Sequence, residues 1–494
     1  MKQTILEMSC LLVASAGALL LTSACTPTTP NESTAGDTAT QTSPGAVDES
    51  RETLLVTGGR VVTMDPELGI LEDGAVAVQN DRIVAVGPSG ELTATYPDAR
   101  RLSAEGGVVL PGLVNVHTHV PMTLFRGMAD DLPLMRWLQE VIFPAEAKHV
   151  DEGLVRAGTR LACLEMILGG TTTFVDMYYY EDAIAEEAAR CGLRAVVGET
   201  LIDFPAPDNK TWDEAMAYTE AFLKKWKGHP LITPAVAPHA VYTVSAEHLA
   251  ATHELATRYD VPYLIHISEH PSEMRDVQER YGTTPLNYLD RLGLLDDRVV
   301  AAHVVLPTDA EIQRLAVQGV GASHCPQSNM KLGAGVSPVT RLLDAGVAVG
   351  LGTDGPASNN DLNMWEEIDT AAKLHKLHLS DPTAIDARTA LRLATLGGAE
   401  VLDMEDQIGS LTVGKKADLI VVSLEGVHQQ PVYDVESVLT YATKASDVRS
   451  MVVDGKILLE NGELKTIDKN DVMDEIRPYR DAILETVKAV KPNL

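Results

Sequence analysis

The sequence predicts an α/β fold, a (β/α)8 barrel with a small β-sandwich domain built from both chain ends. Eight short apolar runs alternate with polar loops and helix-period stretches through the middle of the chain, which is typical of parallel strands buried on both faces. Two β-rich regions bracket these runs: an early one at Thr53–Val86 and a late one made of Gly409–Ser423 and Val448–Leu464. Since the ends of a domain often lie close together, we expect both regions to form one small domain.

The composition is that of a globular protein with room for more than one domain. The 494 residues exceed what one hydrophobic core usually serves, and 45% of them are hydrophobic. Forty Lys and Arg residues against seventy Asp and Glu residues give a formal net charge of −30. Because this charge repels phosphate backbones, we expect no nucleic-acid partner.

The predicted organisation has six segments. They are a signal peptide at residues 1–24, a disordered tether at 25–51, a first sandwich part at 52–110, a TIM barrel at 111–405, a second sandwich part at 406–465 and a C-terminal helix at 466–494.

The first 25 residues read as a secretory signal. An apolar run, Leu11–Leu21, is followed by small residues that end at Cys25, and it is shorter than the ~20 residues of a membrane-spanning helix. The Leu-Thr-Ser-Ala-Cys ending resembles a bacterial lipobox, which implies cleavage before Cys25 and lipidation of its thiol. We therefore expect an exported lipoprotein, at the cell surface or in the periplasm, that meets the membrane only through this lipid. The alternative is simple secretion with an incidental Cys25.

Ionisable residues stand where the predicted barrel strands end. The eight runs end at His119, Met177, Thr200, His239, Glu269, Val305, Pro326 and Asp354. The chemistry of such a barrel lies at the carboxyl ends of its strands. The sequence therefore predicts that these groups meet in one site.

Three histidines and one aspartate form the predicted metal site. His117 and His119 are two apart on one strand and project to the same face, although such a pair alone is weak evidence. His266 lies among aliphatic residues and needs a partner, which is either a metal ion or a backbone carbonyl. Asp354 follows a Gly-rich apolar run, where its alternative role is a helix N-cap.

These ligands leave coordination room for a water, whose pKa a divalent ion lowers toward neutrality. Asp354 is expected to take the proton of this water. Glu269 lies three residues after His266 and is expected to shuttle a proton to the substrate. His303 is expected to orient the water or polarise the leaving group.

Five motifs together resemble the amidohydrolase superfamily. They are PGLVNVHTH at 111–119, HISE at 266–269, AH at 302–303, SHCPQSN at 323–329 and GTDG at 352–355. They are most similar to the branch of methylthioadenosine/S-adenosylhomocysteine deaminases and triazine hydrolases. The similarity runs from about Thr53 to Leu464. Because the fourth strand, Leu231–Ala240, has no Lys to bridge two ions, the resemblance implies one divalent ion, Zn²⁺ or alternatively Fe²⁺.

The resemblance also implies residues that bind a nucleoside. Trp137 would pack against the base, Glu146 would accept hydrogen bonds from the ribose hydroxyls, and His239 would contact the nucleoside. Glu269 and Asp354 would bind the substrate as well. One feature departs from the pattern. Members that take S-adenosylhomocysteine hold its carboxylate with arginines near the third strand, whereas here only Arg194 is close. This puts the homocysteine moiety in doubt and leaves smaller adenosines open.

The sequence therefore predicts an enzyme, a zinc-dependent deaminase of an adenosine-type nucleoside such as methylthioadenosine or S-adenosylhomocysteine, that forms the oxo product and ammonia. Alternatives within this class are a triazine-type chlorohydrolase and a deaminase of guanine or a pterin. An alternative of another class is a catalytically silent, ligand-binding lipoprotein. We expect a homo-oligomer, either a dimer or a tetramer.

Overall fold

The computed structural model describes residues 41–42 and 52–490. The described residues leave out the predicted signal peptide, Cys25 and most of the predicted tether. From the tether they include only Gln41 and Thr42, which form β1 and pair with β4 (Arg82–Pro88). Within the described part of the chain, no helix combines the length and the apolarity needed to cross a membrane.

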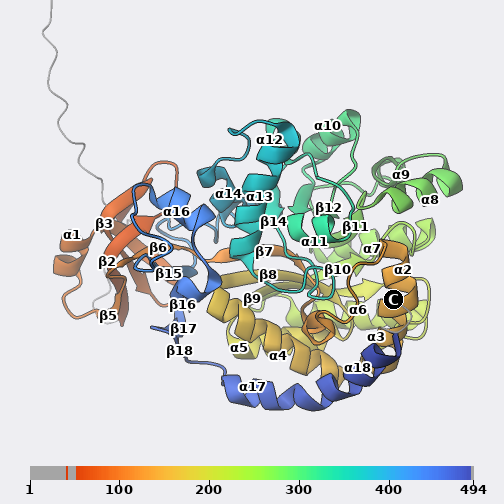
Figure 1. The fold of residues 1–494 in the computed structure, drawn as a ribbon, viewed down its shortest axis with the longest axis horizontal. Helices are drawn as coiled ribbons and strands as arrows, with labels where there is room; N and C mark the ends of the chain where they lie inside the picture. Colours follow the sequence, from red (N-terminus) through yellow and green to blue (C-terminus); the bar gives the residue numbers. More distant parts are fainter. Residues whose placement is uncertain (1–40, 43–51, 491–494) are drawn as a thin grey trace, which may run out of the picture. The chain divides into compact units, whose positions relative to one another are not determined.

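Eight parallel strands form a nearly closed barrel, as predicted (Figure 1). They are β7 (Leu113–Thr118), β8 (Thr171–Tyr178), β9 (Arg194–Leu201), β10 (Ile232–Pro238), β11 (Tyr263–Ile267), β12 (Val299–His303), β13 (Gly321–His324) and β14 (Val349–Leu351). Neighbours in this order are hydrogen-bonded, from β7 to β14. Every residue of these strands is buried except Thr233 on β10, which explains their nearly continuous apolar sequences.

The first and last barrel strands approach each other at their carboxyl ends. The backbone N–H of Asp354, just after β14, donates to the carbonyl of His117 on β7 over 2.9 Å. Gly352 permits this approach, because a Cβ there would lie only 2.9 Å from the His117 nitrogen. The backbone thus brings two predicted metal ligands together from opposite ends of the barrel sequence.

Helices follow most barrel strands and cover the outside of the barrel. They are α4 (Glu152–Gly169), α5 (Glu181–Cys191), α6 (Trp212–Trp226), α7 (Ala246–Tyr259), α8 (Pro271–Tyr281), α9 (Pro285–Leu292), α10 (Asp309–Gln318), α11 (Pro326–Lys331), α12 (Val339–Asp344), α13 (Met364–Leu379), α14 (Ala387–Leu393) and α15 (Leu396–Val401). Between β7 and α4 the chain forms η1 (Val120–Phe125), α2 (Leu134–Arg136), the π-helical η2 (Trp137–Ile142) and α3 (Phe143–His149). This insertion contributes one wall of the site.

A small β domain combines strands from both ends of the chain, as predicted. Its sheet contains β2 (Thr53–Val62), β3 (Ile70–Gln79), β4 (Arg82–Pro88), β5 (Arg100–Ser103), β6 (Gly107–Pro111), β15 (Leu419–Ser423), β16 (Val448–Val453), β17 (Lys456–Glu460) and β18 (Glu463–Leu464). Strand β6 pairs antiparallel with β15, which joins the early and the late strands. Helix α1 (Ser89–Thr95) packs against β2, β3 and β4.

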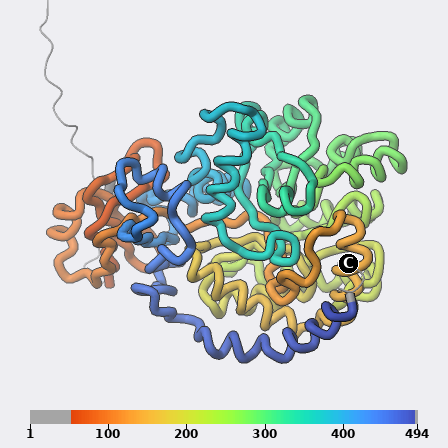
Figure 2. Tube along the Cα trace, viewed as in Figure 1, coloured from red at the N-terminus to blue at the C-terminus, as the bar shows by residue number. Residues whose placement is uncertain are grey.

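The last described residues run back along the barrel. After α16 (Val435–Tyr441) and η3 (Ala445–Asp447), the chain forms α17 (Lys469–Glu475) and α18 (Arg477–Val490) rather than one helix. Pro478 has no backbone N–H to continue the hydrogen bonds of α17. Helix α17 contacts α4 and α18 contacts α3, so the blue end of the chain in Figure 2 lies against the yellow and orange helices.

Arg194 is part of a buried ion cluster that links the barrel to the β domain. Its side chain is 3% exposed at the amino end of β9. It donates to Asp418 over 2.7 and 3.2 Å and to Asp454 over 3.3 Å. Lys416 extends the cluster by donating to Asp454 over 2.9 Å. Arg194 therefore lies at the opposite end of the strand from the predicted site.

Replacing Arg194 by methionine is expected to lower the free energy of unfolding by about 3–5 kcal/mol, because the Asp418 carboxylate, which is 2% exposed, would be buried without its cationic partner. Chemical denaturation measures this loss. Arg190→Met is the control, since that side chain is 62% exposed and its pair with Glu187 is expected to contribute less than about 1 kcal/mol. Equal effects of the two substitutions would contradict the assignment.

Candidate functional site

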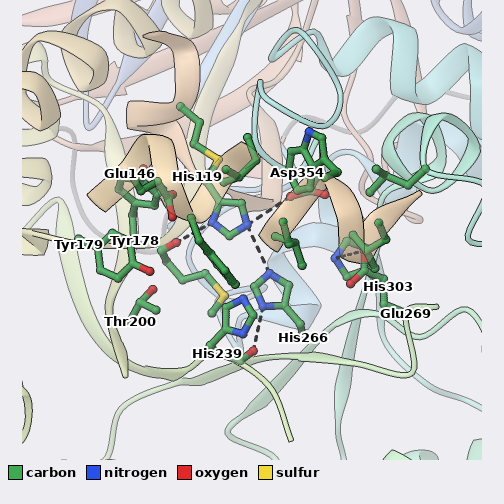
Figure 3. A pocket seen from close by; sticks show the side chains of 18 of the residues that line it. His119, Glu146, Tyr178, Tyr179, Thr200, His239, His266, Glu269, His303 and Asp354 are labelled. Carbon is green, nitrogen blue, oxygen red and sulfur yellow. Dashed lines mark hydrogen bonds and ion pairs between the residues drawn. The ribbon is translucent and has the colours of Figure 1, made fainter. Parts of the chain in front are cut away.

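The predicted site residues meet in one cavity at the carboxyl ends of the barrel strands (Figure 3). The cavity measures about 610 Å³, with open space at its mouth included. Its walls carry three of the predicted metal ligands, His119, His266 and Asp354, together with Trp137, Glu146 and His239. Glu269 and His303 also line it.

The four predicted metal ligands converge at the inner end of the cavity. The Nε2 atoms of His117 and His119 lie 3.5 and 3.3 Å from Asp354 Oδ1. The Nε2 atom of His266 lies 3.3 Å from that of His119. His117, on β7, is 3% exposed.

Hydrogen bonds fix which imidazole nitrogens can bind a cation. His119 Nδ1 lies 2.6 Å from the Met177 carbonyl, and His266 Nδ1 lies 2.9 Å from the His239 carbonyl. Since a carbonyl oxygen only accepts, both rings donate from Nδ1. Their Nε2 lone pairs then face each other, and His117 Nε2 is buried with no hydrogen-bond partner among the described residues. A cation satisfies all three atoms, so the residues fit a divalent metal ion.

The charges at the site also favour a cation. Burial lowers the pKa of His117 to about 4, which keeps this ring neutral and able to ligate. Burial acts in the same direction on His119, but the hydrogen bond and charge of Asp354 outweigh it and raise the pKa to about 9. Burial would raise the pKa of Asp354, but the two histidines hold it well below its usual range. In the metal-free protein, His119 is therefore protonated and its positive charge lies next to the Asp354 carboxylate, at the position where a metal ion would supply that charge.

Three residues that the sequence did not single out hold the Asp354 carboxylate. The hydroxyls of Ser328 and Ser358 donate to its Oδ2 over 2.6 and 2.9 Å, and the Gly355 N–H donates to its Oδ1 over 2.6 Å. The four-residue spacing between Asp354 and Ser358 was a usable signal. Ser328 comes from another strand end and could be found only in the folded structure.

Glu269 and His303 lie beside the ligands. Glu269 Oε1 is 3.9 Å from His303 Nε2, and burial raises the pKa of Glu269 above its usual value. The carboxylate of Glu273 accepts the backbone N–H of Glu269 over 2.8 Å and so supports it from behind. The donor atoms of His303, His117 and His266 also lie within 4.8 Å of one another, so His303 is within reach of the same ion.

The structure places the three residues expected to bind a nucleoside in the same cavity. Trp137 and His239 line it, and His239 Nδ1 is 2.9 Å from Thr243 Oγ1. Glu146 accepts a hydrogen bond from the Tyr178 hydroxyl over 2.7 Å, a contact that the sequence did not reveal. Burial raises the pKa of Glu146 to about 7, against the opposing effect of Tyr178. The charge of His119 also opposes the effect of burial but does not outweigh it, so this buried carboxyl is not fully compensated by a cation.

The raised pKa of Glu146 has a consequence for stability. The unfolded chain releases the Glu146 proton near pH 4.5 and the folded chain near pH 7. Because the folded state binds this proton more tightly, the free energy of unfolding decreases as pH rises through that interval. Glu146→Gln is therefore expected to leave stability unchanged below pH 4.5 and to increase it by roughly 3 kcal/mol above pH 7. Urea denaturation of the metal-free protein at both pH values measures the difference.

The control for this prediction is Glu254→Gln, at a side chain that is 77% exposed. It is expected to leave the pH dependence of stability unchanged. A Glu146→Gln protein that is no more stable than the wild type above pH 7 would contradict the assignment of Glu146 as a buried carboxyl that is not fully compensated.

The chain belongs to the amidohydrolase family, whose sequence model matches residues 108–458. It is 49% identical to a 5-methylthioadenosine/S-adenosylhomocysteine deaminase of Syntrophobacter fumaroxidans, over 87% of this chain and 98% of the relative. It is 44% identical to a protein of the same description from Syntrophus aciditrophicus, over 88% and 98%.

Solved structures of the same fold contain zinc. An adenosine deaminase from Xanthomonas campestris with bound zinc superposes with a TM-score of 0.86 at 44% identity, covering 87% of this chain and 98% of the other. An atrazine chlorohydrolase from Arthrobacter aurescens, complexed with zinc, gives a TM-score of 0.80 at 28% identity, covering 86% and 100%. Together with the geometry, these similarities indicate a hydrolase with a divalent metal site.

Proposed function

We propose that this chain is a zinc-dependent deaminase that replaces the exocyclic amine of an adenosine-type nucleoside, such as methylthioadenosine or S-adenosylhomocysteine, with oxygen and releases ammonia. The observation that carries the proposal is the pair of Glu269 and His303, whose Oε1 and Nε2 atoms lie 3.9 Å apart in the same cavity as the metal ligands His119, His266 and Asp354. An amine leaves only after it is protonated, and this pair offers a buried proton donor at the reacting end of the cavity.

His117, His119, His266 and Asp354 would hold the zinc ion, which when bound acts as a Lewis acid and lowers the pKa of water. Asp354 accepts the proton of the water that attacks the amine-bearing carbon. Glu269, whose pKa is raised by burial, delivers a proton to the ring, and His303 orients the attacking water. A C–O bond forms, the C–N bond breaks, and the proton passed on to the amine leaves with it as ammonia.

The rest of the cavity would recognise the nucleoside. Trp137 walls the base, Glu146 accepts the ribose hydroxyls and His239 contacts the nucleoside from β10. Arg194 does not bind the substrate, because its side chain forms ion pairs with Asp418 and Asp454. We therefore rank methylthioadenosine and adenosine above S-adenosylhomocysteine, whose amino-acid carboxylate has no arginine from this strand.

A substrate panel tests the function. The zinc-loaded protein is expected to release ammonia from methylthioadenosine or adenosine, with slower release from S-adenosylhomocysteine. Chloride release from atrazine without ammonia release from any amine would instead indicate a chlorohydrolase. Release of ammonia only from guanine or a pterin would refute the nucleoside assignment. Ligand binding without turnover, preserved in Asp354→Ala, would indicate the catalytically silent lipoprotein.

We also propose that the protein is an exported lipoprotein, anchored through Cys25, and a dimer or tetramer. The apolar run and the small residues before Cys25 support the first proposal. Metabolic labelling with a fatty-acid probe is expected to mark the wild type and to spare Cys25→Ser. An unlabelled wild type would overturn the anchor. Light scattering of the purified protein measures the oligomer, and a monomer would refute that part.

A further inference from the structure

The imidazole of His303 is held in a constrained position. It ends β12, and the backbone there has φ of +76° at His303 and +42° at the β-branched Val304, a region that costs free energy for such residues. The side chain is 1% exposed. Its ring centroid lies 5.2 Å from that of His117 and 5.6 Å from that of His266. Packing therefore fixes where the ring is, but not which of its nitrogens carries the proton.

Asn329 provides the contact that decides the protonated nitrogen. Its Oδ1 lies 3.1 Å from His303 Nδ1, and its side chain is buried on α11. A carbonyl oxygen accepts, so His303 must donate from Nδ1. The Asn329 amide nitrogen is buried without a hydrogen-bond partner among the described residues. The amide thus accepts from His303 while its own donor stays unsatisfied, an arrangement that costs free energy and that needs an explanation.

We propose that Asn329 is a positioning residue that holds His303 with its proton on Nδ1 and leaves Nε2 as an acceptor 3.9 Å from Glu269. In the opposite tautomer, Nε2 would carry the proton and point it toward the Glu269 carboxylate 3.9 Å away, which would favour a pairing that keeps Glu269 from the substrate. With Nε2 as an acceptor, His303 takes a hydrogen bond from water in the cavity, and Glu269 stays free to move a proton.

The kinetic part of this proposal rests on the proposed deaminase function, whereas the tautomer itself does not. Asn329→Asp keeps an acceptor of the same shape and removes the donor. Asn329→Leu has a similar volume and offers neither. We expect Asn329→Leu to lower kcat by about tenfold or more while its KM stays within about twofold of the wild-type value. We expect Asn329→Asp to keep kcat within about fivefold of the wild-type value.

Nitrogen NMR of the zinc-loaded, full-length protein with ¹⁵N-labelled histidine gives a readout without substrate. The wild type is expected to show one acceptor-type Nε2 signal that disappears in His303→Gln and so belongs to His303. Asn329→Asp should keep this signal and Asn329→Leu should lose it, at unchanged zinc content. A protonated Nε2 in the wild type, or equal losses of kcat in the Asp and Leu variants, would overturn the proposal. Absence of turnover in every protein would refute the deaminase function alone.

Discussion

Replacing Asp354 by asparagine is expected to lower kcat for ammonia release by about 10³-fold or more, because the change removes a metal ligand and the group that accepts the water's proton. Asparagine has the same shape, and the hydroxyls of Ser328 and Ser358 can still pair with its amide. The fold should therefore persist while zinc content falls below one ion per chain. Steady-state kinetics, metal analysis and thermal unfolding measure the three quantities.

Asp361→Asn is the matched control, since it makes the same change on the same loop. Asp361 Oδ1 only accepts the backbone N–H of Asn363 over 3.0 Å, and an asparagine oxygen can do so too. We expect kcat and zinc content to stay at the wild-type values. An Asp354→Asn protein that keeps its zinc and more than a tenth of its kcat would contradict the role of Asp354.

Replacing Glu269 by glutamine is expected to lower kcat by about 10²–10⁴-fold, since glutamine cannot pass a proton to the substrate. The metal ligands are untouched, and Glu273 still accepts the backbone N–H of residue 269. Zinc content and the KM for methylthioadenosine should therefore change little. This separation of kcat from metal binding distinguishes proton transfer from loss of the metal site.

Glu279→Gln, at an exposed position on the helix that follows Glu269, is the control and is expected to leave kcat unchanged. If Glu269→Gln lost its zinc together with its activity, Glu269 would have to be treated as a ligand rather than as a proton donor. If it kept its activity, Glu269 could not be the proton donor of the proposed deaminase mechanism.

The barrel and the metal site could be predicted because their signals are local. Each strand was a short apolar run, and His117, His119, His266 and Asp354 all stood at the ends of such runs. The barrel then requires these ends to meet. The hydrogen bond between the Asp354 N–H and the His117 carbonyl shows that the first and last strands of the barrel are neighbours, as the predicted strand order requires.

The supporting residues could not be predicted, because serine, asparagine and tyrosine occur throughout the chain. Ser328 and Asn329 lie in a motif that was recognised, but their partners Asp354 and His303 belong to other strands. Tyr178 donates to Glu146 in the wall of the cavity, although the two residues are 32 apart in sequence. Such pairs depend on side-chain directions that only the folded chain defines.

Arg194 was expected at the beginning of the third strand, and the structure places it there, at the first residue of β9. The site lies at the other end of that strand. The partners of Arg194, Asp418 and Asp454, come from the late β-rich region, more than 200 residues away. A charge at the amino end of a barrel strand stabilises the fold rather than binding substrate.

A crystal structure of the zinc-loaded protein, with anomalous data collected at the zinc edge, tests the central claim most directly. One anomalous peak is expected about 2.0–2.2 Å from the Nε2 atoms of His117, His119 and His266 and from a carboxylate oxygen of Asp354. No peak at this position, or an ion bound by His303 with His119 and Asp354 unligated, would contradict the account.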